Sequence, residues 1–347
     1  MIYKRLASFA PSLYRGVSDI VQKMSPQRHL VFVTRSDMPE SGISLLRKEC
    51  DVKVWGQPSP VPREEFLKSV AGTSAIYCTL NDKIDKEVLD AAGPGLKVVS
   101  TISVGYDHVD FAECRKRGIK IGYTPDVLTD ATAELTLALL LSTSRRLPEA
   151  QHEARSGGWV SWAPTWMTGP GLAGSTVGIV GFGRIGQAVA RRVKAFNTSK
   201  ILYTNRSERS EAKETGAIKV NFDELLSQSD FVICCAALVP ETKEIFNKVA
   251  FEKMKKTAIF VNTSRGGTVD QDALIEALKN NTIRAAGLDV TTPEPLPLDN
   301  PLFKLKNCVV LPHIGSASIE ARNTMSELTA QNILAVLNDT KMPAELV

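Results

Sequence analysis

The chain has 347 residues, of which 43% are hydrophobic, so it is long enough to bury two cores of ordinary domain size. Its formal net charge of +4 is mild, and its basic residues are scattered rather than interleaved with aromatic residues in patches, which argues against nucleic acid as a partner. No apolar run approaches the roughly eighteen residues needed to cross a bilayer, so no membrane partner is expected.

Residues 1–27 differ in character from the rest of the chain. They contain four basic residues against a single acid, Asp19, and their apolar residues fall near one helical face. We expect a disordered tail, or a chain that starts at Met24, and a protein located in the cytosol. The alternative is a mitochondrial presequence, whose physical character these residues share.

Residues 28–124 alternate short apolar runs with segments of helical period. The strands are expected at Leu30–Thr34, Val52–Trp55, Ala75–Thr79 and Val98–Ile102, and the helices at Ser41–Lys48, Arg63–Val70, Lys86–Ala92 and Phe111–Arg117. Such alternation predicts a parallel sheet with helices on both faces, which makes a small α/β domain.

A strongly apolar helix is expected at Asp130–Arg146, connecting this domain to the next. The segment after it carries three tryptophans, Trp159, Trp162 and Trp166. Large aromatic side chains in a loop are typical of a contact surface, so we expect this loop to be a dimer arm. A loop that packs its tryptophans on itself is the alternative.

An apolar strand-like run at 177–180 turns on glycines into a helical segment that begins near Arg184. Gly181, Gly183 and Gly186 fit the G-x-G-x-x-G spacing, in which the glycines permit a tight turn, close approach to a pyrophosphate and close packing of helix on strand. We therefore expect this turn to hold a dinucleotide, although a plain tight turn has the same spacing. The residues of the turn are Gly181, Phe182, Gly183, Arg184, Ile185 and Gly186.

The choice of dinucleotide depends on the end of the next strand, where the chain reads Thr204, Asn205, Arg206 and Ser207. No carboxylate stands there to repel a 2′-phosphate, and Arg206 can pair with one. NADP(H) is therefore favoured, with NADH possible. In the alternative, Arg206 is a solvated loop cation, an interpretation that the nearby Glu208 keeps open.

After the glycine turn the alternation resumes and predicts a second α/β domain. Its strands are expected at Lys200–Thr204, Phe231–Ala236, Ala258–Asn262, Ala285–Val290 and Val309–Leu311, followed by a last helix at Ile319–Leu337.

Three polar residues follow strands of this second domain: Arg265, Glu294 and His313. Ligands of open parallel sheets lie beyond the carboxyl ends of the strands, so these side chains reach the same edge as the dinucleotide. A guanidinium can bind a substrate carboxylate bidentately, and an imidazole next to a carboxylate can donate a proton as hydride arrives. The set suits reduction of a 2-keto acid. Taken singly, each is more often a structural or surface residue.

The six cysteines, at positions 50, 78, 114, 234, 235 and 308, show no C-x-x-C spacing, and most lie in apolar runs. They are expected to be buried, reduced thiols in a cytosol-like compartment. No cluster has the spacing of metal ligands, so no metal is expected.

Across nearly all of residues 29–347 the sequence resembles the D-2-hydroxyacid dehydrogenase family, and within it the reductases of glyoxylate and hydroxypyruvate. The resemblance rests on the segments 103–108, 123–129, 181–186, 262–266, 287–290, 293–295 and 311–316. It implies NADPH-dependent reduction of these keto acids to glycolate and D-glycerate.

The resemblance also implies the architecture. A Rossmann NADP(H)-binding domain, 125–312, is inserted into a flavodoxin-like substrate-binding domain formed by 28–124 and 313–347. Both are doubly wound parallel sheets, and two chains are expected to form a homodimer through the coenzyme domains.

Functional residues carry over by position. Backbone amides of Val104 and Gly105 would bind the substrate carboxylate with help from Arg265, and Glu294 and His313 would form the acid-base pair. Four further residues would line the nicotinamide: Ala237, Thr263, Asp289 and Gly315.

A non-enzymatic interpretation is a dinucleotide-sensing corepressor that resembles the C-terminal binding proteins, which share this fold and the catalytic residues. The 2′-phosphate pocket suggested by Arg206 argues against it.

Overall fold

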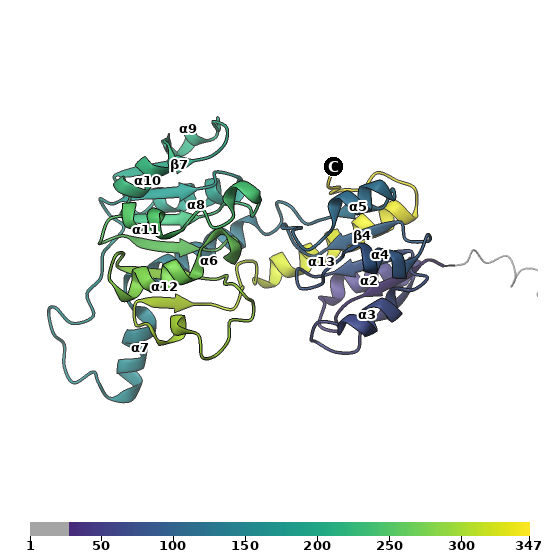
Figure 1. Cartoon of the computed structure of the whole chain (residues 1–347), viewed down its shortest axis with the longest axis horizontal. Helices are drawn as coiled ribbons and strands as arrows, with labels where there is room; N and C mark the ends of the chain where they lie inside the picture. The colour runs from purple at the N-terminus through teal and green to yellow at the C-terminus, as the bar shows by residue number, and fades with distance from the viewer. Residues whose placement is uncertain (1–27) are drawn as a thin grey trace, which may run out of the picture. The chain divides into compact units, whose positions relative to one another are not determined.

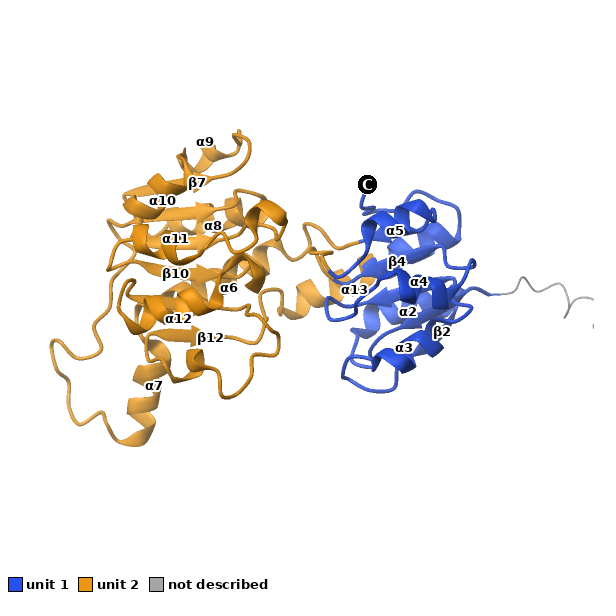
Figure 2. Cartoon of the chain, in the orientation of Figure 1, with its two compact units in different colours: residues 1–102, 108–122, 329–347 blue, residues 103–107, 123–328 orange. Residues whose placement is uncertain are grey.

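The computed structural model describes residues 28–347, which form two compact units (Figure 2). Unit 1 holds 28–102, 108–122 and 329–347, and unit 2 holds 103–107 and 123–328. The extension expected over residues 1–27, with its targeting interpretation, lies outside the described residues.

Unit 1 is built on a five-stranded parallel sheet in the order β2-β1-β3-β4-β5. This is the doubly wound order of flavodoxin-like folds. The strands are β1 (Leu30–Val33), β2 (Asp51–Val54), β3 (Ala75–Cys78), β4 (Val98–Thr101) and β5 (Lys120–Gly122).

The helices of unit 1 bury the central strands. They are α2 (Glu40–Glu49), α3 (Arg63–Val70), α4 (Lys86–Ala92), α5 (Phe111–Lys116) and the last part of α13 (Ile319–Leu337). Phe32, Ile76 and Val99 of the sheet share one apolar cluster with residues of α3, α4 and α5. The C-terminal residues return to the edge strand β5, where Leu346 donates its backbone N–H to Ile121.

Unit 2 is built on a seven-stranded parallel sheet in the order β12-β11-β10-β9-β6-β7-β8. The order in which the chain adds strands reverses between β6 and β9: β7 and β8 lie on one side of this pair, and β10, β11 and β12 lie on the other. Rossmann folds bind dinucleotides at such a switch point. The strands are β6 (Thr176–Val180), β7 (Lys200–Thr204), β8 (Ile218–Lys219), β9 (Phe231–Cys234), β10 (Ile259–Asn262), β11 (Ala285–Leu288) and β12 (Cys308–Val310).

Alternate residues of these strands enter two separate apolar clusters, one on each face of the sheet. One face is covered by α10 (Phe222–Gln228), α11 (Lys248–Lys253) and α12 (Gln271–Lys279). The other is covered by α6 (Thr129–Ser144), α8 (Arg184–Lys194) and the short α9 (Ala212–Thr215). Three 3₁₀ turns complete the unit: η1 (Pro240–Thr242), η2 (Gly266–Thr268) and η3 (Pro301–Lys304).

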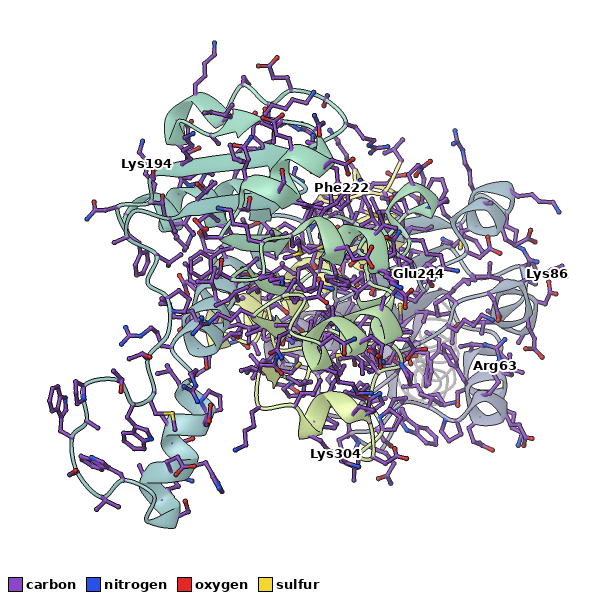
Figure 3. All side chains as sticks on the ribbon, turned by 60° about the vertical axis from the view of Figure 1, so that its left-hand side comes forward. Arg63, Lys86, Lys194, Phe222, Glu244 and Lys304 are labelled. Carbon is purple, nitrogen blue, oxygen red and sulfur yellow. The ribbon has the colours of Figure 1, made fainter. Side chains whose placement is uncertain are left out.

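A projecting arm leaves the body of unit 2. It consists of α7 (Leu147–Ser156), which buries none of its residues, and the loop that follows it (Figures 1 and 3). The side chain of Trp162 is 82% exposed, and Trp159 and Trp166 are also exposed. The alternative of a loop packed on its own tryptophans is therefore wrong for this chain.

The expected α/β fold class, with two parallel-sheet domains, is confirmed. The compact units differ from the expected domain limits at 103–107, 123–124 and 313–328, all of which belong to unit 2. Asp107 and His313 each hydrogen-bond to a residue that follows a strand of this unit. All six cysteines are free thiols; four are buried, and Cys235 and Cys308 are half-buried. In residues 28–347 no helix is long and apolar enough to cross a membrane.

Candidate active site

Every strand of unit 2 runs in the same direction, so the residues after each strand gather along one edge of the sheet. The expected site residues of unit 2 follow this rule. The glycine turn comes after β6, Arg206 after β7, Ala237 after β9, Arg265 after β10, Asp289 after β11 and His313 after β12.

The surroundings of each glycine in the turn explain why that position has no side chain. Gly181 has a φ of +91°, and a Cβ there would lie 2.6 Å from the backbone nitrogen of Ala236. A Cβ on Gly186 would lie 2.2 Å from the carbonyl oxygen of Gly181, so the helix can pack on the strand only without a side chain. Gly183 is different, because nothing lies within 4 Å of its Cβ position.

Gly183 is also the N-cap of α8, and no side chain caps this helix start. The first-turn amides and the positive end of the helix dipole therefore face an open space beside a residue with no side chain. This is the cradle that a pyrophosphate requires. The turn thus fits a dinucleotide by its own geometry.

The three side chains of the turn all contact other parts of unit 2. Phe182 is fully buried and stacks on Tyr203, with ring centroids 4.2 Å apart. Arg184 forms an ion pair with Asp126. Ile185 is half-buried against the α6 side of the sheet. Contact with a dinucleotide at these positions is therefore left mainly to the backbone.

The end of β7 is open and polar. Arg206 and Ser207 are exposed, Thr204 and Asn205 are half-buried, and Asn205 donates its amide N–H to the carbonyl oxygen of Ser207 at 3.0 Å. Arg206 forms no hydrogen bond or ion pair with the rest of residues 28–347. Its guanidinium is available to a ligand.

His313 and Glu294 meet at the carboxyl end of the sheet. The imidazole Nδ1 lies 2.7 Å from Oε2 of Glu294, and Oε1 accepts the backbone N–H of Thr291 at 3.0 Å. Burial acts to raise the pKa of Glu294, but the hydrogen bond and charge of His313, the Thr291 amide and the charge of Arg265 outweigh it and lower the pKa. The carboxylate is therefore ionised and holds a proton on Nδ1.

Asp289 fixes the backbone that carries the imidazole. Its carboxylate accepts the backbone N–H groups of Ile314 at 2.8 Å and Gly315 at 2.7 Å, and its carbonyl oxygen accepts that of His313 at 2.8 Å. Burial raises the pKa of Asp289, against the effect of these amides. Asp289 was expected from the sequence to line the nicotinamide, which stays a prediction. The structure shows that its carboxylate binds two backbone amides.

Arg265 is held at the end of β10. Its Nε donates to Oδ1 of Asp107 at 3.0 Å, and its Nη1 donates to the carbonyl oxygen of Ser264 at 2.9 Å. The guanidinium lies directly against Gly105, next to Val104, both of which belong to unit 2. Asp107 was not predicted from the sequence as a site residue. It lies two residues after Gly105, within the segment 103–108 that carries the family resemblance.

The remaining expected residues lie on the same edge. Thr263 is nearly buried, and its hydroxyl hydrogen-bonds that of Thr136 at 2.7 Å; Ala237 is exposed. Within residues 28–347, no three His, Cys, Asp or Glu side chains are grouped so as to hold a metal ion. A dinucleotide cradle, a guanidinium and an imidazole–carboxylate pair on one sheet edge define a dinucleotide-dependent oxidoreductase.

Comparison with known proteins agrees with this chemistry. The domain family described as "D-isomer specific 2-hydroxyacid dehydrogenase, NAD binding domain" matches residues 137–315. The glyoxylate reductase/hydroxypyruvate reductase of Homo sapiens is 54% identical over 326 residues, which cover 93% of this chain and 99% of that protein. The glyoxylate reductase of Thermococcus kodakarensis is 48% identical over 325 residues, covering 92% and 96%.

A solved structure shares the fold over the same extent. The NADPH-dependent glyoxylate/hydroxypyruvate reductase of Sinorhizobium meliloti, in complex with NADP and malonate, has a TM-score of 0.79 at 31% identity, with coverage of 92% of this chain and 97% of that one. The chain therefore belongs to the D-isomer specific 2-hydroxyacid dehydrogenases, and its cofactor is a nicotinamide dinucleotide. The family resemblance of the sequence is confirmed.

Proposed function

We propose that this protein reduces glyoxylate and hydroxypyruvate, with NADPH as the reductant, to glycolate and D-glycerate. The observation that carries the proposal is the 2.7 Å contact between His313 and Glu294 on the sheet edge that also holds the glycine turn. The relative at 54% identity is named for both keto acids and the relative at 48% for glyoxylate, and these names support the choice of substrates.

The residues of the sheet edge divide the work of the reduction. A bound reduced nicotinamide would supply the hydride that the carbonyl carbon accepts. Arg265, with the backbone amides of Val104 and Gly105, binds the substrate carboxylate and polarises the carbonyl group. His313 donates the proton that the carbonyl oxygen needs, because its Nδ1 is bonded to Glu294 and leaves Nε2 for the substrate. Glu294 holds the imidazole in this orientation.

The residues of the cofactor pocket follow from the strand ends. The glycine turn and the start of α8 hold the pyrophosphate. Arg206 pairs with the 2′-phosphate, assisted by Asn205 and Ser207, and this pairing gives NADPH its preference over NADH. Four residues line the nicotinamide: Ala237, Thr263, Asp289 and Gly315. In this scheme residues 125–312 form the NADP(H)-binding domain, and 28–124 with 313–347 form the substrate-binding domain.

We further propose a homodimer joined through the coenzyme domain. The arm of α7 and the loop Trp159–Trp166 buries little of its own surface, and exposed tryptophans are costly unless a partner covers them. A second copy of this chain is the occupant. The free thiols fit a reducing compartment, so we place the enzyme in the cytosol.

The experiment is a steady-state assay of NADPH oxidation with glyoxylate, hydroxypyruvate, pyruvate and oxaloacetate. The proposal predicts higher kcat/KM for the first two than for the others, and higher kcat/KM with NADPH than with NADH. No oxidation with any keto acid, by folded protein that binds NADPH, would favour a dinucleotide-sensing corepressor instead.

A further inference from the structure

The Arg265 guanidinium is fixed by groups that do not belong to the acid-base pair. Asp107 accepts its Nε at 3.0 Å, across 158 residues of sequence, and the carbonyl oxygen of Ser264 accepts its Nη1 at 2.9 Å. The Arg265 side chain is only 22% exposed, whereas that of Asp107 is 41% exposed. The ion pair thus joins a largely covered guanidinium to a more exposed carboxylate.

Gly105 forms the surface against which the guanidinium rests. A Cβ on Gly105 would lie 1.5 Å from Nη2 of Arg265 and 3.0 Å from Oδ1 of Asp107. The ion pair therefore occupies the space that a side chain at 105 would fill. Ser103 holds this turn by donating its hydroxyl to the carbonyl oxygen of Gly105 at 2.6 Å.

Arg265 keeps N–H donors that a substrate can use. A guanidinium has five N–H donors in a rigid plane. In Arg265 one goes to Asp107 and one to Ser264, and the other three, one on Nη1 and two on Nη2, have no partner within residues 28–347. The hydrogen bond through Nε leaves both Nη2 donors unpaired, and it fixes the plane in which the unpaired donors lie.

We propose that Asp107 is a positioning residue: it locks the Arg265 guanidinium against Gly105 so that its free donors meet the carboxylate and carbonyl oxygens of a 2-keto acid. This inference rests on the proposed function and adds a residue to it. An ion pair with one exposed partner contributes little to folding, so stability alone does not account for a contact that orients this arginine. Pre-orientation removes the cost of ordering a flexible side chain when the substrate binds.

Because Asp107 is charged, removing it can either raise or lower KM, depending on its role. If its role is orientation, removing it weakens substrate binding, because the guanidinium loses its fixed plane. If the carboxylate merely offsets the cation, removing it strengthens the attraction for an anionic substrate and lowers KM. The two roles therefore predict opposite shifts of the same constant.

The experiment compares steady-state kinetics of Asp107→Ala, Asp107→Asn and the unmodified protein with hydroxypyruvate. Asp107→Ala is expected to raise KM by about tenfold to hundredfold, the loss typical of one charge-assisted hydrogen bond, with a much smaller change in kcat and none in the Kd for NADPH. Asp107→Asn keeps an acceptor oxygen and is expected to retain part of the effect. Asp223→Asn, in the exposed pair with Lys253, is the matched control and leaves KM unchanged.

Chemical rescue separates positioning from folding. Arg265→Ala is expected to lose activity and to regain part of it with added guanidinium ion. The rescue is expected to saturate at lower guanidinium concentration when Asp107 is present than in the Asp107→Asn/Arg265→Ala double variant. Equal rescue of both, or an unchanged or lowered KM in Asp107→Ala, would overturn the inference. An inactive unmodified protein would instead remove the proposed function on which it rests.

Discussion

The imidazole of His313 and the carboxylate of Glu294 form a 2.7 Å hydrogen bond across 19 residues of sequence, between the ends of two neighbouring strands of one sheet. The contact uses Nδ1 and both partners are largely covered, with side-chain exposures of 24% and 27%. An imidazole held in this way can present only Nε2 to a substrate. The account of catalysis depends on that orientation.

Replacing the imidazole tests the proton donor. His313→Ala is expected to lower kcat by roughly 10²–10⁴-fold, the usual contribution of a positioned general acid. NADPH binding, followed by nicotinamide fluorescence, is expected to remain because the glycine turn and Arg206 are untouched. A variant that turned over at the unmodified rate would assign the proton donation to another group.

Removing the carboxylate charge tests Glu294. Glu294→Gln removes the charge-assisted hydrogen bond that holds Nδ1 of His313, so the imidazole loses its fixed orientation and kcat is expected to fall by about tenfold to hundredfold. Steady-state kinetics with NADPH and hydroxypyruvate measure the change. A kcat equal to that of the unmodified protein would contradict the pairing.

The stability of the protein in acid tests the same carboxylate independently. The pKa of Glu294 is lowered in the folded chain, so its contribution to the free energy of unfolding is present above the ordinary glutamate pKa and is lost as the pH falls through the lowered value. The difference in free energy of unfolding between the protein and Glu294→Gln is therefore expected to shrink in acid. Urea titrations at neutral and acidic pH measure it, and a difference that grew in acid would reverse the assigned sign.

The cofactor preference is expected to depend on Arg206. Arg206→Ala removes the cation available to a 2′-phosphate and is expected to lower kcat/KM for NADPH by about tenfold to hundredfold. Because NADH has no 2′-phosphate, its kcat/KM serves as the internal reference and changes little. Lys248→Ala, at an exposed lysine of α11, is the control. Equal losses with both dinucleotides would show that Arg206 does not read the phosphate.

The oligomeric state is expected to depend on the projecting arm. Trp162→Ser removes the most exposed of its tryptophans and is expected to shift the protein from dimer toward monomer in sedimentation equilibrium. Phe303→Ser, at an exposed aromatic residue outside the arm, is the matched control. A dimer of unchanged affinity in Trp162→Ser would place the contact elsewhere.

Much of this fold could be predicted because buried parallel strands read as continuous apolar runs, and the strand at 200–204 and the helix at 319–337 fall where they were expected. The elements that were missed lack that signal. β5 and β8 are short edge strands, and α7 buries no residue, so it carries no apolar stripe. The pairing of Asp107 with Arg265 joins segments far apart in the chain, and no local pattern encodes such a contact.

The site residues, too, were predictable only where a local sequence signal exists. Gly181 and Gly186 are required by local geometry, which a spacing motif records, so the glycine turn was predictable. The place of His313 after β12 was predictable too, since strand ends share an edge. That Asp289 holds the backbone of Ile314 and Gly315 was not, because a buried carboxylate can bond in many ways that the sequence does not distinguish.

The most direct measurement follows deuterium from NADPH labelled at the transferable position of its nicotinamide into the product formed from hydroxypyruvate. D-Glycerate is expected, with the label on the carbon that carried the keto group, formed rapidly by the unmodified protein and at a small fraction of that rate by His313→Ala. An unlabelled product, L-glycerate, or equal rates in the two proteins would contradict this expectation.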